Sequence, residues 1–436
     1  MENKTILSRS RRVLPGVAIF ILIGLATPGY PFHSGGVGEC EGCHTVHNSQ
    51  GGTPLTSTAN PVGMANANLL LGSDSSSTCL SCHAAPESAP TGHHVMTVPF
   101  LQTTLPAGMT PGGDFTWLAK SYTWTSGSPP TPGGSEGQRH GHNVAATDYG
   151  IFSDTRTTVA PGGTYPATSL GCISCHDPHG RSRMMDTAGN FSTTGKPIRT
   201  SGSYGEDPDG RFAVGAYRIL GGAGYRPLSL PGVPQFTNRP MIAASPVTYN
   251  RSEGVPGNQV RVAYGRGTTD WCTNCHTGMH GGGAAGSFQH PSDRAIGSTI
   301  AANYNAYIMT GNMTGNGTTA FTSLVPFQHT NLSQNSVLAT FRPLRSGPMG
   351  GDRVTCLTCH RAHASGWDSA LRFNNVSEFL TVADSAGIAV YPDPAANPAQ
   401  AMGRTIQETQ RAYYDRPANT FSPFQRALCN KCHPAD

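Results

Sequence analysis

The sequence predicts a mostly irregular coil with short helices and few short strands, built around something other than a large protein core. The 436 residues include 54 Gly and 34 Pro, and both residue types interrupt regular helices and strands. Only 37% of the residues are hydrophobic and 12% are charged, about half the charged fraction of an ordinary soluble domain. Disorder fits poorly too, because the formal charge is only +4 and 8% of the residues are aromatic.

The cysteines indicate what replaces the missing core. All 12 Cys fall into C-x-x-C pairs, and each pair is followed at once by His. C-x-x-C-H is the attachment motif of c-type haem, in which the thiols form thioethers and the His becomes the proximal iron ligand. Numbered one to six in chain order, the sites are Cys40/Cys43/His44, Cys79/Cys82/His83, Cys172/Cys175/His176, Cys272/Cys275/His276, Cys356/Cys359/His360 and Cys429/Cys432/His433.

Two other interpretations of paired cysteines are zinc sites and a disulfide framework. Neither requires a His directly after every pair, and only 17 of the 436 residues are His. The motifs therefore predict six haem c groups, each with one iron. The predicted fold is a multihaem cytochrome c, with the coil wrapped around a haem chain and Phe, Tyr and Trp packing on the haem faces.

Residues 1–31 are predicted to be a secretory signal peptide. Basic residues precede an apolar stretch, Val13–Ala26, that is short for a membrane span and contains Pro15 and Gly16. An uncleaved anchor is the alternative, but small residues at Gly24 and Ala26 favour cleavage after Ala26 or nearby. Export also suits haem c, which is attached outside the cytoplasm in bacteria. The protein is therefore expected to be secreted, at the outer cell surface or beyond it.

Residues 32–436 are expected to form a single hexahaem cytochrome domain. The motifs are unequally spaced, so they do not indicate a solenoid. The segments between them are rich in Gly, Pro and Ser, which favours loops. Short helices are expected near the attachment sites and around Gln407–Tyr414, and a short strand at Val260–Tyr264. We see no basic patch for nucleic acid, so no nucleic-acid partner is predicted.

The second iron ligand is expected to be His at all six haems, because 11 His remain beyond the proximal ones. Met is the competing ligand, and the chain has 12 Met. His47, His179 and His363 each lie three residues after a proximal His, too close to reach the far face of the same haem, so a neighbouring iron is the expected target. Further candidates are His33, His94, His142, His280 and His290, whereas His93, His140 and His329 are expected to bind no iron.

Seven stretches spread over residues 32–436 carry a resemblance to a known family: Phe32–Ser49, Met109–Phe115, Ala160–Ala167, Cys172–Gly180, Gly215–Gly222, Cys356–Gly366 and Gln425–His433. They resemble, in order, segments of the hexahaem outer-surface c-type cytochromes that form extracellular conductive filaments. The resemblance implies a homopolymer with a continuous stack of bis-His haems. It also implies that His47 of one subunit ligates the fifth haem of the neighbouring subunit. The eight matching distal candidates exceed the six irons by two.

The predicted function is electron transfer rather than enzymatic catalysis, because two protein ligands on every iron leave no open position. One hypothesis is a filament that conducts electrons to extracellular metal oxides, electrodes or other multihaem cytochromes. A monomeric periplasmic or cell-surface electron shuttle is the alternative. A multihaem reductase would need an open iron, often marked by an altered proximal ligand, and all six motifs here end in His.

Overall fold

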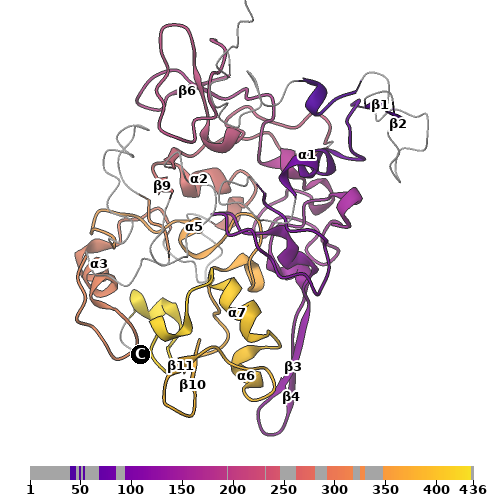
Figure 1. Ribbon diagram of the computed structural model, residues 1–436. Coiled ribbons are helices and arrows are strands. Elements are labelled where there is room, and N and C mark those ends of the chain that lie inside the picture. The colour runs from indigo at the N-terminus through magenta and orange to yellow at the C-terminus, as the bar shows by residue number, and fades with distance from the viewer. Residues whose placement is uncertain are drawn as a thin grey trace, which may run out of the picture.

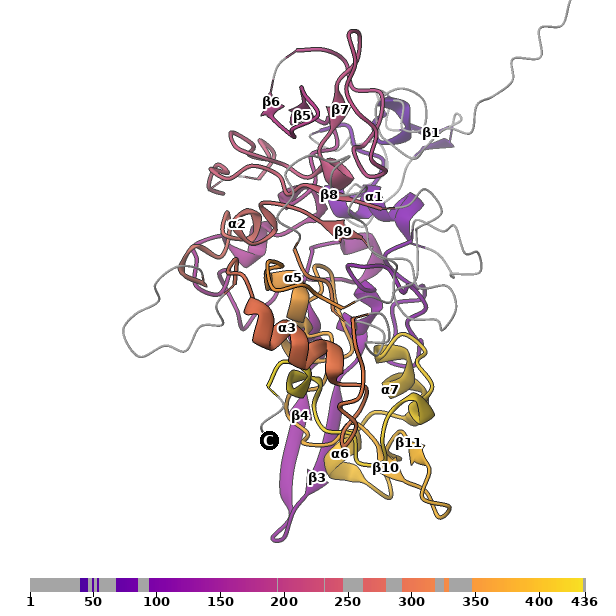
Figure 2. The ribbon, with the colours of Figure 1, turned by 90° about the vertical axis from the view of Figure 1, so that its left-hand side faces the viewer.

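The computed structural model describes residues 40–45, 49–50, 53–54, 68–84, 94–193, 195–230, 232–245, 262–279, 292–317, 325–328 and 347–433. The predicted signal peptide, residues 1–31, lies outside this part of the chain. Loops dominate the described residues, and Figure 2 shows them as an elongated body. None of the helices among them is long and apolar enough to cross a membrane.

The helices are short, as the abundance of Gly and Pro predicts. The longest described α-helix has 10 residues. The α-helices are α1 (Ser75–His83), α2 (Thr268–Cys272), α3 (Gly297–Ala306), α5 (Cys356–Cys359), α6 (Pro398–Ala401) and α7 (Ile406–Ala412). The 3-10 turns are η1 (Cys40–Gly42), η2 (Phe115–Ala119), η3 (Gly137–His140), η4 (Thr147–Tyr149), η5 (Ala167–Ser169), η6 (Cys172–Ser174), η7 (Tyr217–Ile219), η8 (Thr277–Met279), η9 (Asp368–Ala370), η10 (Ala418–Thr420) and η11 (Leu428–Lys431).

The strands form small antiparallel sheets rather than a layer. β5 pairs with both β6 and β7, and the other described pairs are β1–β2, β3–β4, β8–β9 and β10–β11. The bounds are β1 (Ser49–Gln50), β2 (Thr53–Pro54), β3 (Tyr122–Ser126), β4 (Thr131–Ser135), β5 (Arg183–Met184), β6 (Phe191–Ser192), β7 (Val214–Gly215), β8 (Ala243–Ala244), β9 (Ala263–Tyr264), β10 (Val382–Ala383) and β11 (Ala389–Val390).

The predicted fold class is confirmed, with mostly coil, short helices and few short strands. The expected helix at Gln407–Tyr414 corresponds to α7. Its start has a physical cause, because Thr405 and Glu408 form a capping box that satisfies both backbone N–H groups. Of the expected strand at Val260–Tyr264, the described part forms a strand only over Ala263–Tyr264, which pairs with β8.

The attachment segments are spread along the long axis of the molecule. In both views α1 lies toward one end, α2 and α5 lie further along, and the C-terminal region lies toward the other end, where the β3–β4 hairpin also projects (Figures 1 and 2). The hydrophobic core consists of clusters of buried side chains distributed along the body of the molecule. Its largest described cluster includes Trp117, Tyr304, Trp367 and Tyr413.

Candidate haem sites

Every attachment motif begins on a short helical turn. The turns are η1, α1, η6, α2, α5 and η11. A C-x-x-C spacing in a helical turn places both cysteines on one face, so the two thiols can reach the same haem edge. At site five Thr355 caps the turn of Cys356–Cys359, because its backbone N–H donates to the Thr358 hydroxyl. The short helices expected at the attachment sites are thus present.

The first cysteines of neighbouring sites meet at two junctions. The neighbouring Cys172 thiol raises the pKa of the Cys79 thiol, and the Cys356 thiol raises the pKa of Cys272, because the two thiols of each pair lie close together. The supporting elements also pack together, α1 on η6 and α2 on α5. Site two therefore adjoins site three, and site four adjoins site five.

At the remaining junctions the second cysteine of one site lies near one or both cysteines of the next site. Burial raises the pKa of the Cys43 thiol, and Cys82 raises it further because two thiolates would repel each other. Burial likewise raises the pKa of Cys175, with a contribution from Cys275. Burial raises the pKa of Cys359 to about 12, with contributions from both cysteines of site six, Cys429 and Cys432. The six sites thus follow one another in chain order, with two kinds of junction alternating.

The proximal His of site five is held by a backbone carbonyl clip. The Ser369 carbonyl accepts a hydrogen bond of 2.8 Å from Nδ1 of His360. Ser369 and Ala370 both have left-handed backbone, with φ of 58° and 54°. This conformation costs a non-glycine residue roughly 1–2 kcal/mol. Leu371 then pairs with His360 as an antiparallel bridge, so the strained turn directs a carbonyl at the ring.

The same clip recurs at sites one and three. At site one the Asn68 carbonyl accepts from Nδ1 of His44 at 2.9 Å, and at site three the Arg218 carbonyl accepts from His176 at 2.8 Å. In each case the acceptor residue or the residue after it has left-handed backbone. The Leu two positions after the acceptor forms an antiparallel bridge with the proximal His. The corresponding residues are Leu69 and Leu70 at site one, and Arg218, Ile219 and Leu220 at site three.

Site four uses a glycine version of the clip. The Pro161 carbonyl accepts from Nδ1 of His276 at 2.9 Å, and Gly162 follows with φ of 69°. At all four clipped sites the carbonyl can only accept, so Nδ1 carries the proton. The lone pair of Nε2 is then available to iron, which is the usual arrangement at a metal-bound imidazole.

We predict that Gly163→Ala disrupts site four. A Cβ at this position would lie 1.8 Å from the Cys275 carbonyl oxygen, so the clip would have to move away from the motif. Overpacking of this kind costs about 1–3 kcal/mol or more. A thermal melt and a haem count should show a lower Tm and fewer attached haems. Gly210→Ala is the matched control, because nothing lies within 4 Å of its Cβ position. Equal Tm values for the two variants would contradict the prediction.

Three predicted distal His face three proximal His. The ring centroids of His44 and His179 are 6.4 Å apart, and the rings are within 10° of parallel. His176 and His363 are also 6.4 Å apart, with the rings tilted by 58°. An iron–nitrogen bond of about 2 Å and a further ~1.1 Å to each ring centroid would put two opposed ligand rings about 6 Å apart. In both pairs the ring centroids are therefore about as far apart as two His ligands of one iron would be.

The third pair is His142 and His276, at 6.1 Å and 52°. Nδ1 of His142 donates to the Ala362 carbonyl at 2.7 Å, so this distal candidate is oriented in the same manner as the clipped proximal rings. In all three pairs the two rings come from segments that are far apart in the sequence. The residues present thus fit a haem iron at sites one, three and four.

The other distal candidates are less fully described. His94 lies beside site two, where the backbone N–H of Val95 donates to the carbonyl of His83 at 2.9 Å. His33, His47, His280 and His290 lie outside the described residues, as do His93 and His329. His140 was expected to bind no iron, and its ring is fully buried with Nδ1 at 2.9 Å from the Trp117 carbonyl and Nε2 at 2.8 Å from the Ser135 hydroxyl. Both of its nitrogens are thus engaged by protein groups.

Acidification through pH 6.5 is expected to leave the low-spin absorbance spectrum of the haem-loaded protein unchanged, because the ligand rings are held neutral. Burial lowers the pKa of His363 to about 3, with contributions from His176 and His142, and burial also lowers the pKa of His142 and His360. A depressed pKa means that the folded state prefers the neutral ring. Stability is therefore complete above the unfolded value of about 6.5 and is lost as the pH falls toward 3. A spectral transition centred near pH 6.5 would contradict this prediction.

Sequence reasoning missed the clip residues. Asn68, Pro161, Arg218 and Ser369 act through the main-chain carbonyl, so their side chains carry no signature of the role. The available signal is positional, since a Leu stands two residues after the acceptor at sites one, three and five.

Comparison with known proteins was made by sequence and by structure. No family model matches the chain. The chain is 45% identical over 445 residues to the C-type cytochrome OmcS of Geobacter sulfurreducens, a match covering 99% of this chain and 100% of OmcS. Its fold matches a cryo-EM structure of OmcS nanowires from that organism, with a TM-score of 0.84, 46% identity and coverage of 93% and 100% of the two chains. The outer membrane cytochrome S filament of the same organism matches with a TM-score of 0.84, 45% identity and the same coverage.

Proposed function

The chain belongs to the OmcS family of c-type cytochromes, and on that premise we propose that it polymerises into filaments that conduct electrons for extracellular electron transfer. Membership makes it a haem c protein with an electron-transfer role. The two similar structures are filaments of OmcS, and each is covered over its whole chain. We propose the same assembly here, located outside the cell, with residues 1–31 removed on export and residues 32–436 forming one hexahaem domain.

The observation that carries the proposal is the ordered series of sites. Consecutive motifs adjoin from one to six, so haems attached there would lie next to each other along the body. Bound haem supplies the redox-active iron. The protein supplies the thioether cysteines and, at sites one, three, four and five, holds the proximal His as a neutral ring whose Nε2 would be free to bind the metal. A ligand set of two His per iron favours electron transfer, because it leaves no position for a substrate.

We propose a specific ligand set for the described sites. Site one takes His44 and His179, site three takes His176 and His363, and site four takes His276 and His142. His94, whose neighbour Val95 is hydrogen-bonded to the His83 carbonyl, is the described candidate for site two. His33, His280 and His290 remain candidates for the irons without an assigned ligand, including that of site six, held by His433.

Assembly is proposed to depend on His47. The family resemblance assigns this residue to the fifth haem of the neighbouring subunit, at Cys356, Cys359 and His360. A coordination bond of this kind would join two subunits and bring the haem series of one into contact with that of the next. Partners of the filament would be other multihaem cytochromes and extracellular metal oxides or electrodes.

Electron cryo-microscopy of the protein sheared from cell surfaces tests this function. Ordered filaments with six haems per subunit and two His on every iron are expected. Discrete particles alone would instead support a monomeric electron shuttle. A high-spin signal from an open iron in the intact protein would contradict the bis-His assignment and favour catalysis at that iron.

A further inference from the structure

A buried polar cluster lies directly next to the clip of site five, and none of its members is a proposed haem ligand. It joins the end of β4 and the turn η3 to η9 and to the short segment between α6 and α7. The members are Ser135, Arg139, His140, Asp368 and Arg404. Three of them are almost completely buried, with exposed fractions of 1% for Ser135, 0% for His140 and 1% for Arg404. Polar side chains buried to this extent need hydrogen-bond partners, so the cluster fixes the geometry around it.

The hydroxyl of Ser135 is the centre of this cluster. It donates a hydrogen bond of 2.6 Å to Oδ1 of Asp368 and accepts one of 3.0 Å from Nη2 of Arg404. Nε2 of His140 lies 2.8 Å from the same hydroxyl oxygen, and Nη2 of Arg139 lies 2.8 Å from Oδ2 of Asp368. Burial by itself would raise the pKa of Asp368, but its hydrogen-bonding neighbours and the Arg139 charge lower it more, so the carboxylate is ionised at neutral pH. Both carboxylate oxygens are thus held in place.

Arg404 is fixed in turn by its own neighbours. Its Nε donates to the Gly366 carbonyl at 2.8 Å, and its Nη1 donates to the Met402 carbonyl at 3.1 Å. The guanidinium carbon lies 4.3 Å from the ring centroid of Tyr122 and 4.5 Å from that of Trp367. Such contacts on both faces and along the edge leave the guanidinium little freedom to move. The cluster is therefore a rigid support for the residue that it holds.

Asp368 directly precedes the clip residue, so the cluster fixes one end of the strained turn. The Ser369 carbonyl accepts from the His360 ring, and both Ser369 and Ala370 have left-handed backbone. The other end is fixed by the backbone N–H of Arg361, which donates to the Ala370 carbonyl at 2.8 Å. Strained backbone persists only where the surrounding structure over-determines it. The Asp368 side chain supplies that constraint on the side of the turn that leads into the clip.

We propose that Asp368 is a positioning residue for the fifth haem: through the buried cluster it keeps the Ser369 carbonyl on His360 and thereby lowers the reduction potential of that haem. This inference rests on the proposed function, since it requires haem c at site five. A carbonyl that accepts from Nδ1 makes the imidazole a stronger donor to a metal at Nε2. A stronger donor stabilises ferric iron more than ferrous iron, so the potential falls.

Redox titration of the holoprotein, followed by absorbance, tests the proposal with Asp368→Ala and Ser135→Ala. Each variant should raise one component of the titration about tenfold in its reduction equilibrium constant, equivalent to 59 mV for a one-electron couple. Ser135→Ala changes no charge, so a shift in that variant reports the position of the clip. Asp384→Ala is the matched control, because Asp384 also accepts from backbone N–H groups in a turn but is exposed.

Asp368→Asn separates position from charge. Its amide oxygen can still accept from Ser135 although the negative charge is gone, so its titration should stay close to that of the unmodified protein. Electron paramagnetic resonance gives a second readout, because the g values of a low-spin haem depend on its axial imidazoles. One low-spin signal should change in both alanine variants. An equal shift in Asp368→Asn and Asp368→Ala, with none in Ser135→Ala, would overturn the proposal, since the carboxylate would then act only through its charge.

A haem count on every variant keeps this inference apart from the proposed function. Fewer than six haems in the unmodified protein would overturn the hexahaem assignment, whereas six haems with unshifted potentials in both alanine variants would overturn only the role of Asp368. Should both alanine variants fail to load haem, cryo-microscopy of the unmodified holoprotein decides the matter. The Ser369 carbonyl is expected at Nδ1 of His360 with Asp368 on Ser135. Either group turned away from its partner would overturn the proposal.

Discussion

His47→Ala is expected to abolish filaments while leaving six haems attached to each subunit. The thioether bonds are made by the cysteines, which the substitution does not touch. The coordination bond across the subunit interface would be lost, and the fifth iron would keep only His360. Electron microscopy of sheared material should show no filaments, and the purified protein should gain a high-spin component corresponding to one haem in six.

The control for this variant is His329→Ala, which removes a His expected to bind no iron. It should assemble normally and remain wholly low-spin. Filaments of ordinary length from His47→Ala, with an unchanged spectrum, would show that the ligand of the fifth haem comes from elsewhere. A variant that lost haem altogether would point to a folding role for His47 and would also contradict the prediction.

The parts of the protein that could be predicted from sequence are those fixed by covalent chemistry at fixed spacing. The C-x-x-C-H motifs indicate haem attachment, and the same i, i+3 spacing predicts the short helical turns that carry them. The helix α7 was also predictable, because Thr405 and Glu408 provide a local cap. Such signals lie within a few residues of one another and do not depend on the path of the loops.

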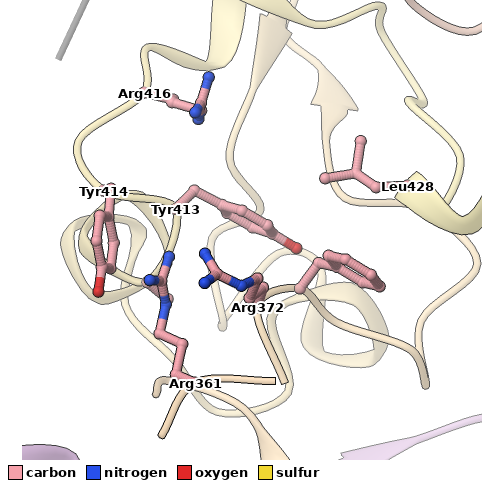
Figure 3. Close-up of a pocket in the computed structure, with 8 residues that line it drawn as sticks. Arg361, Arg372, Tyr413, Tyr414, Arg416 and Leu428 are labelled. Carbon is pink, nitrogen blue, oxygen red and sulfur yellow. The ribbon is translucent and has the colours of Figure 1, made fainter. Parts of the chain in front are cut away.

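The facing His pairs could not be derived in this way. His179 lies opposite His44, and His363 opposite His176, through loops whose course is set by packing over the whole chain. Spacing from the proximal His excludes the nearest iron but selects no other. The small pocket lined by Arg361, Arg372 and Arg416 (Figure 3) could not be predicted either, because Arg361 and Arg416 are far apart in sequence and come together only in the folded chain.

The backbone strain in the carbonyl clips has a functional interpretation that could not be predicted from the sequence. Leucine, isoleucine, alanine, serine and arginine all adopt left-handed backbone at the clips, where glycine would be easier. Site four alone among the four clipped sites uses glycine at this position, Gly162. We infer that the strain is tolerated because a fixed acceptor fixes both the tautomer and the orientation of the proximal ring.

Replacing His179 should separate ligand loss from loss of conduction. His179 is exposed in the chain, so its removal is expected to leave the fold intact. In His179→Ala the haem of site one should become high-spin, because His44 alone would remain on the iron. In His179→Met that haem should stay low-spin with a raised potential, since Met and His together raise the potential relative to two His.

The Met variant is the more informative, because it should lower conduction with every haem present and six-coordinate. Axial ligands set haem potentials over about 0.8 V, so a rise on the order of 0.2 V is reasonable for this change. A shift of 59 mV changes the equilibrium constant of a one-electron transfer tenfold, so this rise lowers the equilibrium constant for electron release from site one by roughly 10³-fold. In a filament each subunit would contain one such trap in series, so current along the filament should fall steeply although its length and haem content are normal. Unchanged conductance in His179→Met filaments with a verified shift in potential would show that electrons bypass site one, and the continuous series of six haems would no longer explain conduction.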